Sequence, residues 1–576
     1  MEEIKEAIAE LVLNQLKHTA LKKDDILNII EIPPSPELGD YAFPCFILAK
    51  EMKKSPVDIA TGLATEIKPG KTHKDISGIK AAGPYLNFFL DKKIMVEQAI
   101  NKILKEKEKF GKAKEAKKGK VMVEFCHANT HKAFHIGHTR NISLGESISR
   151  ILESRGFKVI RANYQGDIGM HVAKTLWGML NLKKLGLKEP ENEKGKWLGI
   201  VYAKASQAAK NEKTAEEINK INQELYSGDK KLSDLWKKTR KWSIDYFEKV
   251  IYPDFDAKFD RFYFESEVEK EGVKIAKKLL GDKIAKLSEG AIIMDFEKQG
   301  LGVFILLKSD GTPLYSTKDL ELAELQDKEY KPDRILHIVA SEQNLYFSQL
   351  IKTIHSYNGK LAEKEEHISY ELVILPTGKM ASREGNVILY DDTLEEIKGL
   401  VKAEITKRDK GINSTELEKR AKKISLGAIK YSMLKQSPNK TIVFNEEEIT
   451  RFEGDTGPYL QYSYARASSI LKKAKISEIS IKSIKISSLE LHEIELARKL
   501  YQLPNVIEGA CRQLNPSSIA NYSFELAKLF NEFYHACPVI HSSKEVQNQR
   551  LALVQSFRIV MKNALHLLGM DAIEEM

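Results

Sequence analysis

One segment constrains the fold of this 576-residue chain more than any other. The apolar run 121–125 leads into Ala-Phe-His-Ile-Gly-His-Thr-Arg at 133–140, and a helical pattern follows. A helix that opens directly after a strand points its free backbone N–H groups and its positive dipole end at a bound anion. His135 and His138 can donate hydrogen bonds to phosphate oxygens, and Gly137 lets a flat base approach the backbone. The segment therefore predicts a nucleotide site, with ATP as the expected ligand.

A second segment, far downstream, carries the charges that such a site needs. The strand-like run 372–375 leads into Pro-Thr-Gly-Lys-Met-Ala-Ser-Arg-Glu-Gly-Asn at 376–386. A glycine-bounded loop with Lys379 and Arg383 can close over a triphosphate and stabilise the charge that develops during transfer. Alone, a His-x-x-His pair among 14 histidines is as often surface decoration as chemistry. The two segments together favour chemistry.

The pattern of the whole chain predicts four parts. Residues 1–110 read as a small α+β module, and the lysine-rich stretch 111–120 as a linker. Between 121 and 400, β-branched runs alternate with helical periods, as a Rossmann-like, doubly wound parallel sheet in an α/β fold requires. A charged helical stretch at about 185–275 is interpreted as an insertion in that domain. Residues 401–576 repeat at helical spacing, which predicts an all-α helical bundle.

Composition limits the partners and the compartment. Lys and Arg outnumber Asp and Glu by 91 to 81, and the formal charge of +10 suits a polyanionic partner. Cys45, Cys126, Cys511 and Cys537 have neither disulfide-framework nor zinc-ligand spacing, so no structural zinc is expected. The N-terminus resembles no signal or transit peptide, and no apolar run approaches the roughly 20 residues that span a bilayer. We expect a cytoplasmic monomer without a membrane partner.

The two motifs resemble the His-Ile-Gly-His and Lys-Met-Ser-Lys-Ser pair of class I aminoacyl-tRNA synthetases. The segments around them are similar to one member of that class, the arginyl-tRNA synthetase family. The similar segments are the lead-in 124–138, Tyr-Ser-Thr-Lys-Asp-Leu at 315–320, Gln343, the helical-domain entry 455–466, the chain end 564–576, and Gly-Asp-Tyr-Ala at 39–42. The resemblance runs nearly end to end.

The resemblance implies an arginine–tRNA ligase, which activates L-arginine with ATP and Mg²⁺ and transfers it to the 3′-terminal ribose of tRNA(Arg). It implies tRNA binding by the N-terminal module and anticodon binding by the helical bundle. Mg²⁺ should be held by the phosphates of ATP rather than by a protein cage. The implied ATP-binding residues are His135, Gly137, His138, Lys379, Met380 and Ser382. The implied catalytic residues are His135, His138, Lys132, Lys379 and Arg383. The implied arginine-binding residues are Glu124, Asn129, Tyr315, Asp319 and Gln343, and the implied tRNA-binding residues are Asn87, Tyr534 and Met576.

The chemistry of arginine agrees with this pocket. A guanidinium is planar and permanently charged, so its receptor needs carboxylates in fork geometry, which Glu124 and Asp319 can supply. Taken singly, Asp319 is as well explained as a helix-terminus charge, and Glu124 as the partner of a lysine. The aromatic ring of Tyr534 usually packs in an amphipathic helix, and a terminal residue such as Met576 is commonly frayed.

Two positions depart from the family pattern. Ser382 stands where the loop usually carries its second lysine, and Tyr346 stands where a histidine usually follows the glutamine. Lys132, three residues before His135, can bring an ammonium group to the same phosphates, and Arg383 is the rival donor.

Two other classes of function stay open at this stage. One is a different adenylyl-transferring enzyme, either another class I synthetase or a small-molecule nucleotidyltransferase. The long helical tail and the basic charge balance argue against the nucleotidyltransferase. The other is a non-catalytic tRNA-binding paralogue. The intact His135, His138 and Lys379 speak against the latter.

Overall fold

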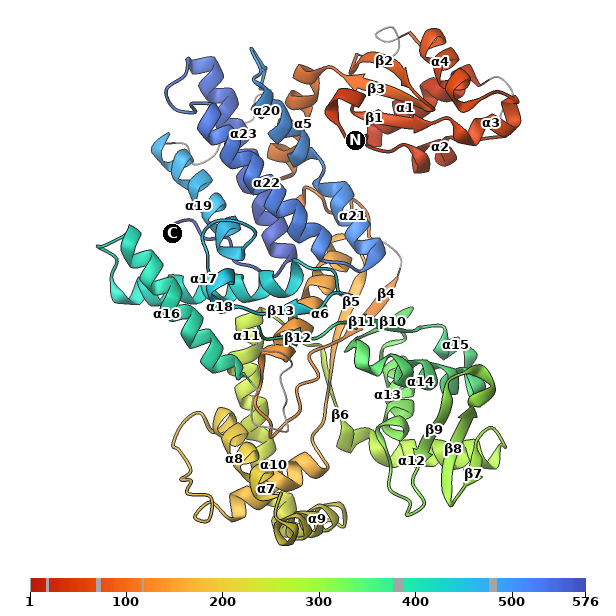
Figure 1. The fold of residues 1–576 in the computed structure, drawn as a ribbon, viewed down its shortest axis with the longest axis vertical. Helices are drawn as coiled ribbons and strands as arrows, with labels where there is room; N and C mark the ends of the chain where they lie inside the picture. Colours follow the sequence, from red (N-terminus) through yellow and green to blue (C-terminus); the bar gives the residue numbers. More distant parts are fainter. Residues whose placement is uncertain (1, 17–19, 69–73, 117–118, 377–387, 476–483) are drawn as a thin grey trace. The chain divides into compact units, whose positions relative to one another are not determined.

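A computed structural model describes residues 2–16, 20–68, 74–116, 119–376, 388–475 and 484–576 (Figure 1). The chain packs into two compact units. The first unit comprises Met1–Phe110, Ala467–Leu503 and Lys528–Val560, and the second comprises Gly111–Arg466, Pro504–Ala527 and Met561–Met576. Both sequence motifs belong to the second unit.

The second unit is built on a five-stranded parallel sheet with the order β11-β10-β4-β5-β6. The strands are β4 (Lys120–Glu124), β5 (Lys158–Gln165), β6 (Arg261–Phe264), β10 (Arg334–Ala340) and β11 (Glu365–Tyr370). The strand order reverses between β4 and β10, because later strands lie on both sides of β4. Open α/β sheets bind ligands at such a switch point, outside the carboxyl ends of the strands. The expected doubly wound α/β fold is confirmed.

Strand β4 and helix α6 (Ile136–Ser154) form the predicted strand–loop–helix unit. Val121, Met122 and Val123 are at most 1% exposed, which explains an unbroken apolar run in a strand covered on both faces. The helix ends two residues before Gly156, whose φ of +85° turns the chain into β5.

Further helices follow α6 along the chain. They are α7 (Met170–Leu180), α8 (Lys194–Ala208), α9 (Glu212–Tyr226), α10 (Lys230–Tyr246), α11 (Tyr252–Phe255), α12 (Glu265–Gly281), α13 (Tyr315–Tyr330), α14 (Asn344–Tyr357) and α15 (Gly359–Ala362). Helices α8 to α11 lie in the expected insertion, but β6 lies inside the same range and belongs to the sheet. Strand β6 was not predicted, because its four residues Arg-Phe-Tyr-Phe are too few to show a periodic pattern.

A separate antiparallel sheet was also not predicted. Its order is β7-β8-β9, and its strands are β7 (Lys286–Ser288), β8 (Ala291–Phe296) and β9 (Gly302–Leu307). The buried residues Met294 and Leu306 join the core that also holds Leu320 of α13. This sheet therefore supports the start of α13, where two expected site residues lie.

The first unit contains the α+β module. Its antiparallel sheet has the order β1-β3-β2, with β1 (Tyr41–Pro44), β2 (Ile76–Ala82) and β3 (Tyr85–Leu90). Its helices are α1 (Glu2–Gln15), α2 (Lys23–Ile29), α3 (Phe46–Met52), α4 (Pro56–Glu66) and α5 (Lys92–Glu106). Asn87 lies in the middle strand, opposite Ala42 and Lys80, and is only 3% exposed. The expected contact of Asn87 with tRNA stays a prediction.

The C-terminal part of the chain is helical, as predicted. Its helices are α16 (Tyr390–Arg408), α17 (Ser414–Leu434), α18 (Glu446–Ile449), α19 (Gly457–Lys473), α20 (Leu491–Tyr501), α21 (Leu503–Gln513), α22 (Ser517–Ala536) and α23 (Lys544–Leu567). One short strand, β13 (Ile442–Val443), interrupts them and pairs in parallel with β12 (Val373–Ile374).

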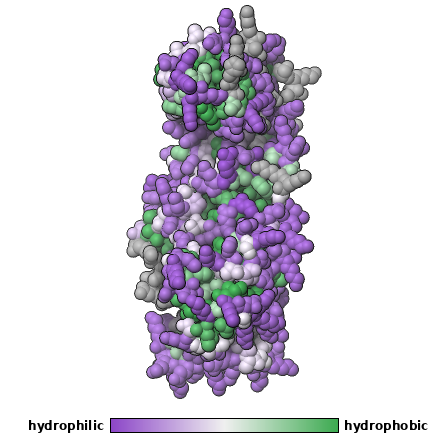
Figure 2. All heavy atoms as spheres, turned by 90° about the vertical axis from the view of Figure 1, so that its right-hand side faces the viewer, coloured by the Kyte–Doolittle hydropathy of each residue, from purple (hydrophilic) through white to green (hydrophobic). Residues whose placement is uncertain are grey.

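The molecular surface is mainly hydrophilic on the face drawn in Figure 2, where apolar residues form scattered patches. Among the described helices, none is both long enough and apolar enough to cross a membrane.

The crossing of α6 over the sheet yields a stability prediction. A Cβ added at Gly145 would lie 2.1 Å from Cγ of Phe125, whereas a Cβ at Gly399 on α16 would meet no atom within 4 Å. Gly145→Ala should therefore destabilise the protein by about 1–3 kcal/mol or more through overpacking. The control Gly399→Ala should stabilise it by up to about 1 kcal/mol. Urea denaturation midpoints measure both, and equal midpoints for the two variants would contradict the close packing.

Candidate active site

The loop between β4 and α6 has an unusual backbone. Cys126, His127 and His131 adopt positive φ values of 81°, 51° and 64°, which residues other than glycine rarely do. His131 is fully buried, and its ring nitrogens lie 2.9 Å from Oγ1 of Thr130 and 2.8 Å from Oγ1 of Thr239. Helix α10 therefore holds the loop in a defined shape.

The loop ends in the two histidines of the first motif. His135 is the N-cap of α6, and its backbone N–H donates to Nδ1 of His138 over 3.2 Å. The two rings stack with their centroids 3.7 Å apart. Burial, aided by the charge of Lys132, lowers the pKa of His135 to about 4, and burial also lowers the pKa of His138 well below its usual value. Both rings are therefore neutral at neutral pH and can offer an N–H to an anion.

The structure brings the flank of the second motif to the first. The backbone N–H of Ile136 donates to the carbonyl of Ile388, and the N–H of Tyr390 donates to the carbonyl of Phe134. These residues directly follow the second motif in the chain. The motif residues Lys379, Met380, Ser382 and Arg383 themselves lie outside the described residues.

The preceding flank of the second motif is held by Arg140, on the helix that the histidines open. Its guanidinium is fully buried and donates to the backbone carbonyls of Leu372, Ser437, Pro438 and Lys440 over 2.9–3.5 Å. A buried guanidinium needs several acceptors, and these carbonyls come from the segments that lead into β12 and β13. Helix α6 therefore contacts the chain on both sides of the second motif.

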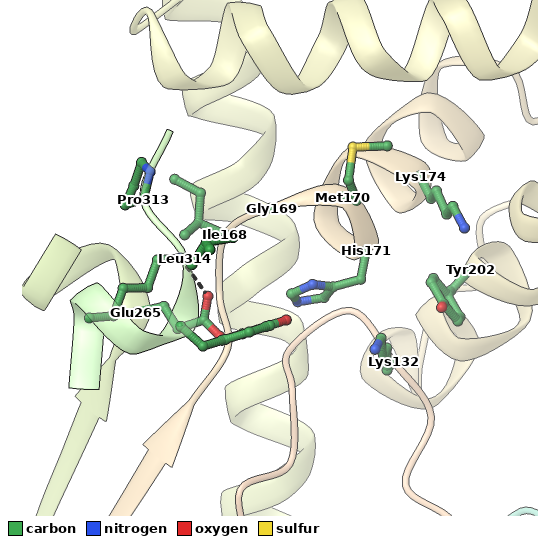
Figure 3. A pocket seen from close by; sticks show the side chains of 12 residues that line it. Lys132, Ile168, Gly169, Met170, His171, Lys174, Tyr202, Glu265, Pro313 and Leu314 are labelled. Atoms are coloured by element: carbon green, nitrogen blue, oxygen red, sulfur yellow. Dashed lines mark hydrogen bonds and ion pairs between the residues drawn. The ribbon is translucent and has the colours of Figure 1, made fainter. Parts of the chain in front are cut away.

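A cavity of about 350 Å³ opens beside this loop (Figure 3). It is lined by Lys132, Ile168, Gly169, Met170, His171, Lys174, Tyr202, Glu265, Pro313, Leu314, Tyr315 and Lys318. Figure 3 shows Lys132, Lys174 and Tyr202 gathered on one side of the cavity and Glu265 on the other. The ammonium of Lys132 lies 5.6 Å from the ring centroid of Tyr202, and the pKa values of both histidines of the first motif respond to its charge. Lys132 therefore lies near both the cavity and the motif.

Glu124 and Asp319 form an acidic site beside the cavity. Oε1 of Glu124 lies 3.0 Å from Nδ1 of His337, and its Oε2 accepts a hydrogen bond from Gln326. Burial alone would raise the pKa of Glu124, but the charge and hydrogen bond of His337 leave it lowered. Oδ2 of Asp319 accepts from the hydroxyl of Tyr346. Burial is the largest cause that raises the pKa of Asp319, to about 7, and the charge of Glu124 adds to it.

Two polar atoms of this site lack a hydrogen-bond partner among the described residues. Oδ1 of Asp319 and the hydroxyl oxygen of Tyr164 are buried and have no hydrogen-bond partner among the described residues. The charges of Asp319, Glu265 and Glu124 all act on the pKa of Tyr164, so these groups are near one another. Buried polar atoms are normally satisfied, and an acidic set with orphaned acceptors fits a cationic ligand rich in N–H groups.

The other expected pocket residues lie near the same edge of the sheet. Tyr315, at the start of α13, is 63% exposed and lines the cavity. Oδ1 of Asn129 accepts from the backbone N–H of Gly166, where a Cβ would approach that oxygen to 2.3 Å. Gln343 is exposed in a short 3-10 helix directly after β10. Of the described residues, neither Asn129 nor Gln343 lines the cavity.

Several residues of the site were not predicted from the sequence. Glu265 directly follows β6, a strand position that would have marked it, but β6 was taken for part of the insertion. His171 and Lys174 lie on α7, just after the glycine-containing turn that ends β5. Tyr164 and His337 lie inside strands and read as core residues. No local pattern distinguishes a core histidine from one that faces two carboxylates.

The expected tRNA contacts in the helical region have different settings. Tyr534 on α22 is 39% exposed. Met576 is the last residue of the chain and is half-buried. Both side chains are thus at least partly accessible.

Three family models match the chain in series. They are described as "Arginyl tRNA synthetase N terminal domain" over residues 1–90, "tRNA synthetases class I (R), catalytic domain" over 99–445, and "DALR anticodon binding domain" over 460–576.

Relatives and solved structures give the same result over the full length. The arginine–tRNA ligases of Bdellovibrio bacteriovorus and Clostridium perfringens are 37% and 36% identical to this chain. The first match covers 96% of this chain and 95% of the relative, and the second covers 98% and 99%. The arginyl-tRNA synthetase structure from Thermus thermophilus superposes with a TM-score of 0.81 at 27% identity, over 100% of this chain and 99% of that one.

The raised pKa of Asp319 predicts how stability depends on pH. The folded-state pKa of about 7 exceeds the roughly 3.9 of an unfolded aspartate, so the protonated side chain favours the folded state. That contribution is complete below about pH 4 and is lost as the pH rises through about 7. The always neutral Asp319→Asn variant should resist urea better than the parent at about pH 8, by about 1–3 kcal/mol after allowance for partial solvent screening.

The advantage should shrink as the pH falls toward about 5, since the parent carboxyl then regains its proton. Asp282→Asn, an exposed position after α12, is the matched control and should show no such trend. A stability difference at Asp319 that stays constant between about pH 5 and pH 8 would contradict the buried, proton-binding carboxyl.

Proposed function

The chain belongs to the arginyl-tRNA synthetase family, and on that premise we propose how its residues divide the reaction. Its activity is that of an arginine–tRNA ligase, with ATP, L-arginine and tRNA as substrates. The arginine carboxylate attacks the α-phosphate of ATP and displaces pyrophosphate, which gives arginyl-adenylate. The terminal ribose of tRNA(Arg) then attacks the adenylate carbonyl and displaces AMP.

Asp319 is the proposed direct partner of the arginine guanidinium. A guanidinium supplies five N–H donors and a fixed positive charge. Oδ1 of Asp319, buried and without a partner among the described residues, is the observation that carries this proposal. Glu124 contributes mainly its negative charge, because both of its oxygens already accept hydrogen bonds from His337 and Gln326. Arginine binding thus brings a counter-charge to two neighbouring carboxylates.

Tyr315, Asn129 and Gln343 complete the proposed arginine site. Tyr315 is included because it lines the cavity. Asn129 is included because it fixes Gly166 at the carboxyl end of β5, and Gln343 because it directly follows β10 at the switch point. The polar side chains of these three residues suit the amino and carboxylate groups of the amino acid.

The start of α6 is the proposed site of the ATP phosphates. His135 and His138 are neutral rings at the N-terminus of a 19-residue helix, and Gly137 leaves the backbone between them open. The helix dipole and free N–H groups favour phosphate there. Lys379, Met380, Ser382 and Arg383 are added from the sequence resemblance, since they lie outside the described residues.

Lys132 is proposed to replace the second loop lysine of the family pattern, whose position is occupied here by Ser382. It lines the cavity and stands close enough to His135 for its charge to affect the pKa of that ring. Negative charge grows on the departing pyrophosphate, and a nearby ammonium stabilises it in the transition state. Arg383 remains the alternative donor.

Recognition of tRNA is proposed to involve the helical end of the chain. The anticodon-domain match covers residues 460–576, which include Tyr534 and Met576. Tyr534 is exposed enough to stack on a base. The N-terminal module, which carries Asn87 in its middle strand, is proposed to bind tRNA as well.

Mg²⁺ is proposed to arrive on the phosphates of ATP. The described part of the chain has no group of three or more His, Cys, Asp or Glu residues arranged to hold a metal ion, and Mg²⁺ is commonly bound through substrate phosphates.

The protein is proposed to act as a monomer in the cytoplasm. The cysteines Cys45, Cys126, Cys511 and Cys537 are free and buried, as suits a reducing compartment.

Arginine specificity can be tested at Asp319. Asp319→Asn should raise the KM for arginine by about 10²-fold, because a bound cation loses its counter-charge, and should leave the KM for ATP nearly unchanged. Pyrophosphate exchange with tRNA(Arg) present measures both, and other amino acids should support little exchange. We expect little exchange without tRNA. An unchanged KM for arginine in this variant would remove Asp319 from the pocket.

The same site should give arginine binding a pH dependence. Because the pKa of Asp319 is about 7, the free enzyme must lose a proton to bind the guanidinium at lower pH. The KM for arginine should therefore fall as the pH rises from about 6 to about 8, by up to tenfold per pH unit below the pKa. Asp319→Asn should abolish this trend, and its persistence in the variant would assign the proton to another group.

The role of Lys132 is tested by a rescue. Lys132→Ala should lower the activation rate by roughly 10²-fold with little change in arginine affinity, because its contact is made mainly in the transition state. Ser382→Lys should restore part of the rate by returning a cation to the loop. Lys158→Ala, an exposed lysine on β5, is the control. Near-normal activation by Lys132→Ala beside a severe loss in Arg383→Ala would transfer the role to Arg383.

A further inference from the structure

A buried histidine joins three strands of the parallel sheet beneath the acidic site. His337 lies on β10 and is 5% exposed. Its Nδ1 lies 3.0 Å from Oε1 of Glu124 on β4, and its Nε2 lies 2.5 Å from Oε2 of Glu365 on β11. Glu124 and Glu365 are themselves only 2% and 8% exposed. The histidine thus bridges two carboxyl groups on the two neighbouring strands.

The geometry fixes the number of protons in this triad. Each of its two hydrogen bonds joins a ring nitrogen to a carboxylate oxygen, and each bond needs one proton. One imidazole and two carboxyl groups that share two such protons carry a net charge of −1, whichever atom holds each proton. With both protons on the ring, His337 is an imidazolium and Glu124 and Glu365 are both ionised.

The surroundings of His337 favour the imidazolium. Burial opposes the charged ring, but the charges and hydrogen bonds of Glu124 and Glu365 raise the pKa of His337 well above its usual value. The ring centroids of Phe347 and His337 lie 5.3 Å apart. The other titratable groups that act electrostatically with His337 are His127 in the β4–α6 loop, Asp319 on α13 and His367 on β11. Asp319 is the acid to which the arginine guanidinium is assigned above.

We propose that His337 is a positioning residue for arginine recognition, which keeps the Glu124 carboxylate charged and in place near Asp319. The inference rests on the proposed function and deepens it. His337 acts through Glu124: one oxygen is fixed by His337 and the other by Gln326, so the carboxylate cannot turn away from the site. Its negative charge then remains available to the guanidinium bound at Asp319.

Loss of the imidazolium should change the protonation of the site. Without the buried cation, the Glu124 carboxylate is buried with no counter-charge on β10 and is expected to take up a proton. Glu124 is then neutral for part of the time, and the arginine guanidinium loses one of its two counter-charges. ATP does not depend on this charge.

The first test is the His337→Gln variant, assayed by pyrophosphate exchange with tRNA present. The amide retains a hydrogen-bond donor but no charge. The KM for arginine should rise tenfold or more at about pH 7, with the KM for ATP and the rate at saturating arginine within about twofold of the parent. His367→Gln is the matched control, because His367 is the register partner of His337 on β11 and bonds the carbonyl of Val339 instead of a carboxylate. It should leave the KM for arginine unchanged.

Two further readouts separate this role from simple packing. The excess of the KM for arginine in His337→Gln over that of the parent at the same pH should shrink as the pH rises from about 7 to about 9, since Glu124 then regains its charge. Adding Glu365→Gln should also restore arginine affinity, because it removes the competing acid and leaves Glu124 ionised. A residue that only filled space would show neither recovery, and the double variant would then be worse than the single one.

An observation on the unsubstituted protein does not depend on whether the variants fold. With ¹⁵N-labelled histidine, the ring of His337 should keep both nitrogens protonated from about pH 6 to about pH 9. A ring nitrogen without a proton in that range would overturn the proposal, as would an unchanged KM for arginine in a folded His337→Gln variant.

The outcome also separates this inference from the proposed arginine site. If Asp319→Asn raises the KM for arginine and His337→Gln does not, only the role of His337 fails. If neither variant changes that KM, the arginine site itself is misplaced.

Discussion

Helix α6 is the element on which the rest of the active-site unit depends. It is buried along almost its whole length, so its polar side chains need internal partners. Arg140 donates hydrogen bonds to backbone carbonyls of the segments that lead into β12 and β13. Arg150 bonds Glu146 on the same helix and the carbonyl of His566 near the chain end, and Ser147 bonds the carbonyl of Leu567. Segments hundreds of residues apart are thereby fixed to the helix that begins with the histidine motif.

This arrangement explains why catalytic groups can be precise although they come from distant segments. The backbone bonds of residues 388–390 to residues 134–136, and the grip of Arg140 on Leu372, fix the chain on both sides of the second motif. The rate of a displacement at phosphorus depends mainly on position and on electrostatic stabilisation, since little covalent chemistry is asked of the protein. Rigid ends are therefore a functional requirement of this loop as well as a packing result.

The sequence predicted the parts of the site that rest on local patterns. The strand, histidine loop and helix around residues 121–154 follow from an apolar run and a 3.6-residue period, and the structure contains them. The parts that depend on distant pairing were missed. Strand β6 is too short to show a period, and the β7–β9 sheet lies inside an α/β pattern.

The acidic site shows most clearly why such partners cannot be read locally. Glu124 was expected to bind arginine, and its sequence context says nothing of Gln326 or His337, which lie about 200 residues away. The parallel register of β4 and β10 places His337 opposite Glu124, whereas Gln326 reaches it from α13. A buried carboxylate needs such partners, and only the folded chain determines which residues supply them.

The same reasoning explains the effect of Tyr346, which departs from the family pattern. A histidine is usual at this position in the family, whereas here a phenol donates a hydrogen bond to Oδ2 of Asp319 without adding a charge. This hydrogen bond holds the carboxylate in place and lowers the pKa of Asp319, but burial outweighs it, and the pKa stays raised, to about 7. In the proposed arrangement the buried cation lies instead at His337, where it compensates one of the two charges of Glu124 and Glu365 and leaves Asp319 for the guanidinium. Orientation and charge compensation, which one histidine beside Asp319 could combine, are thus divided between two residues on different elements.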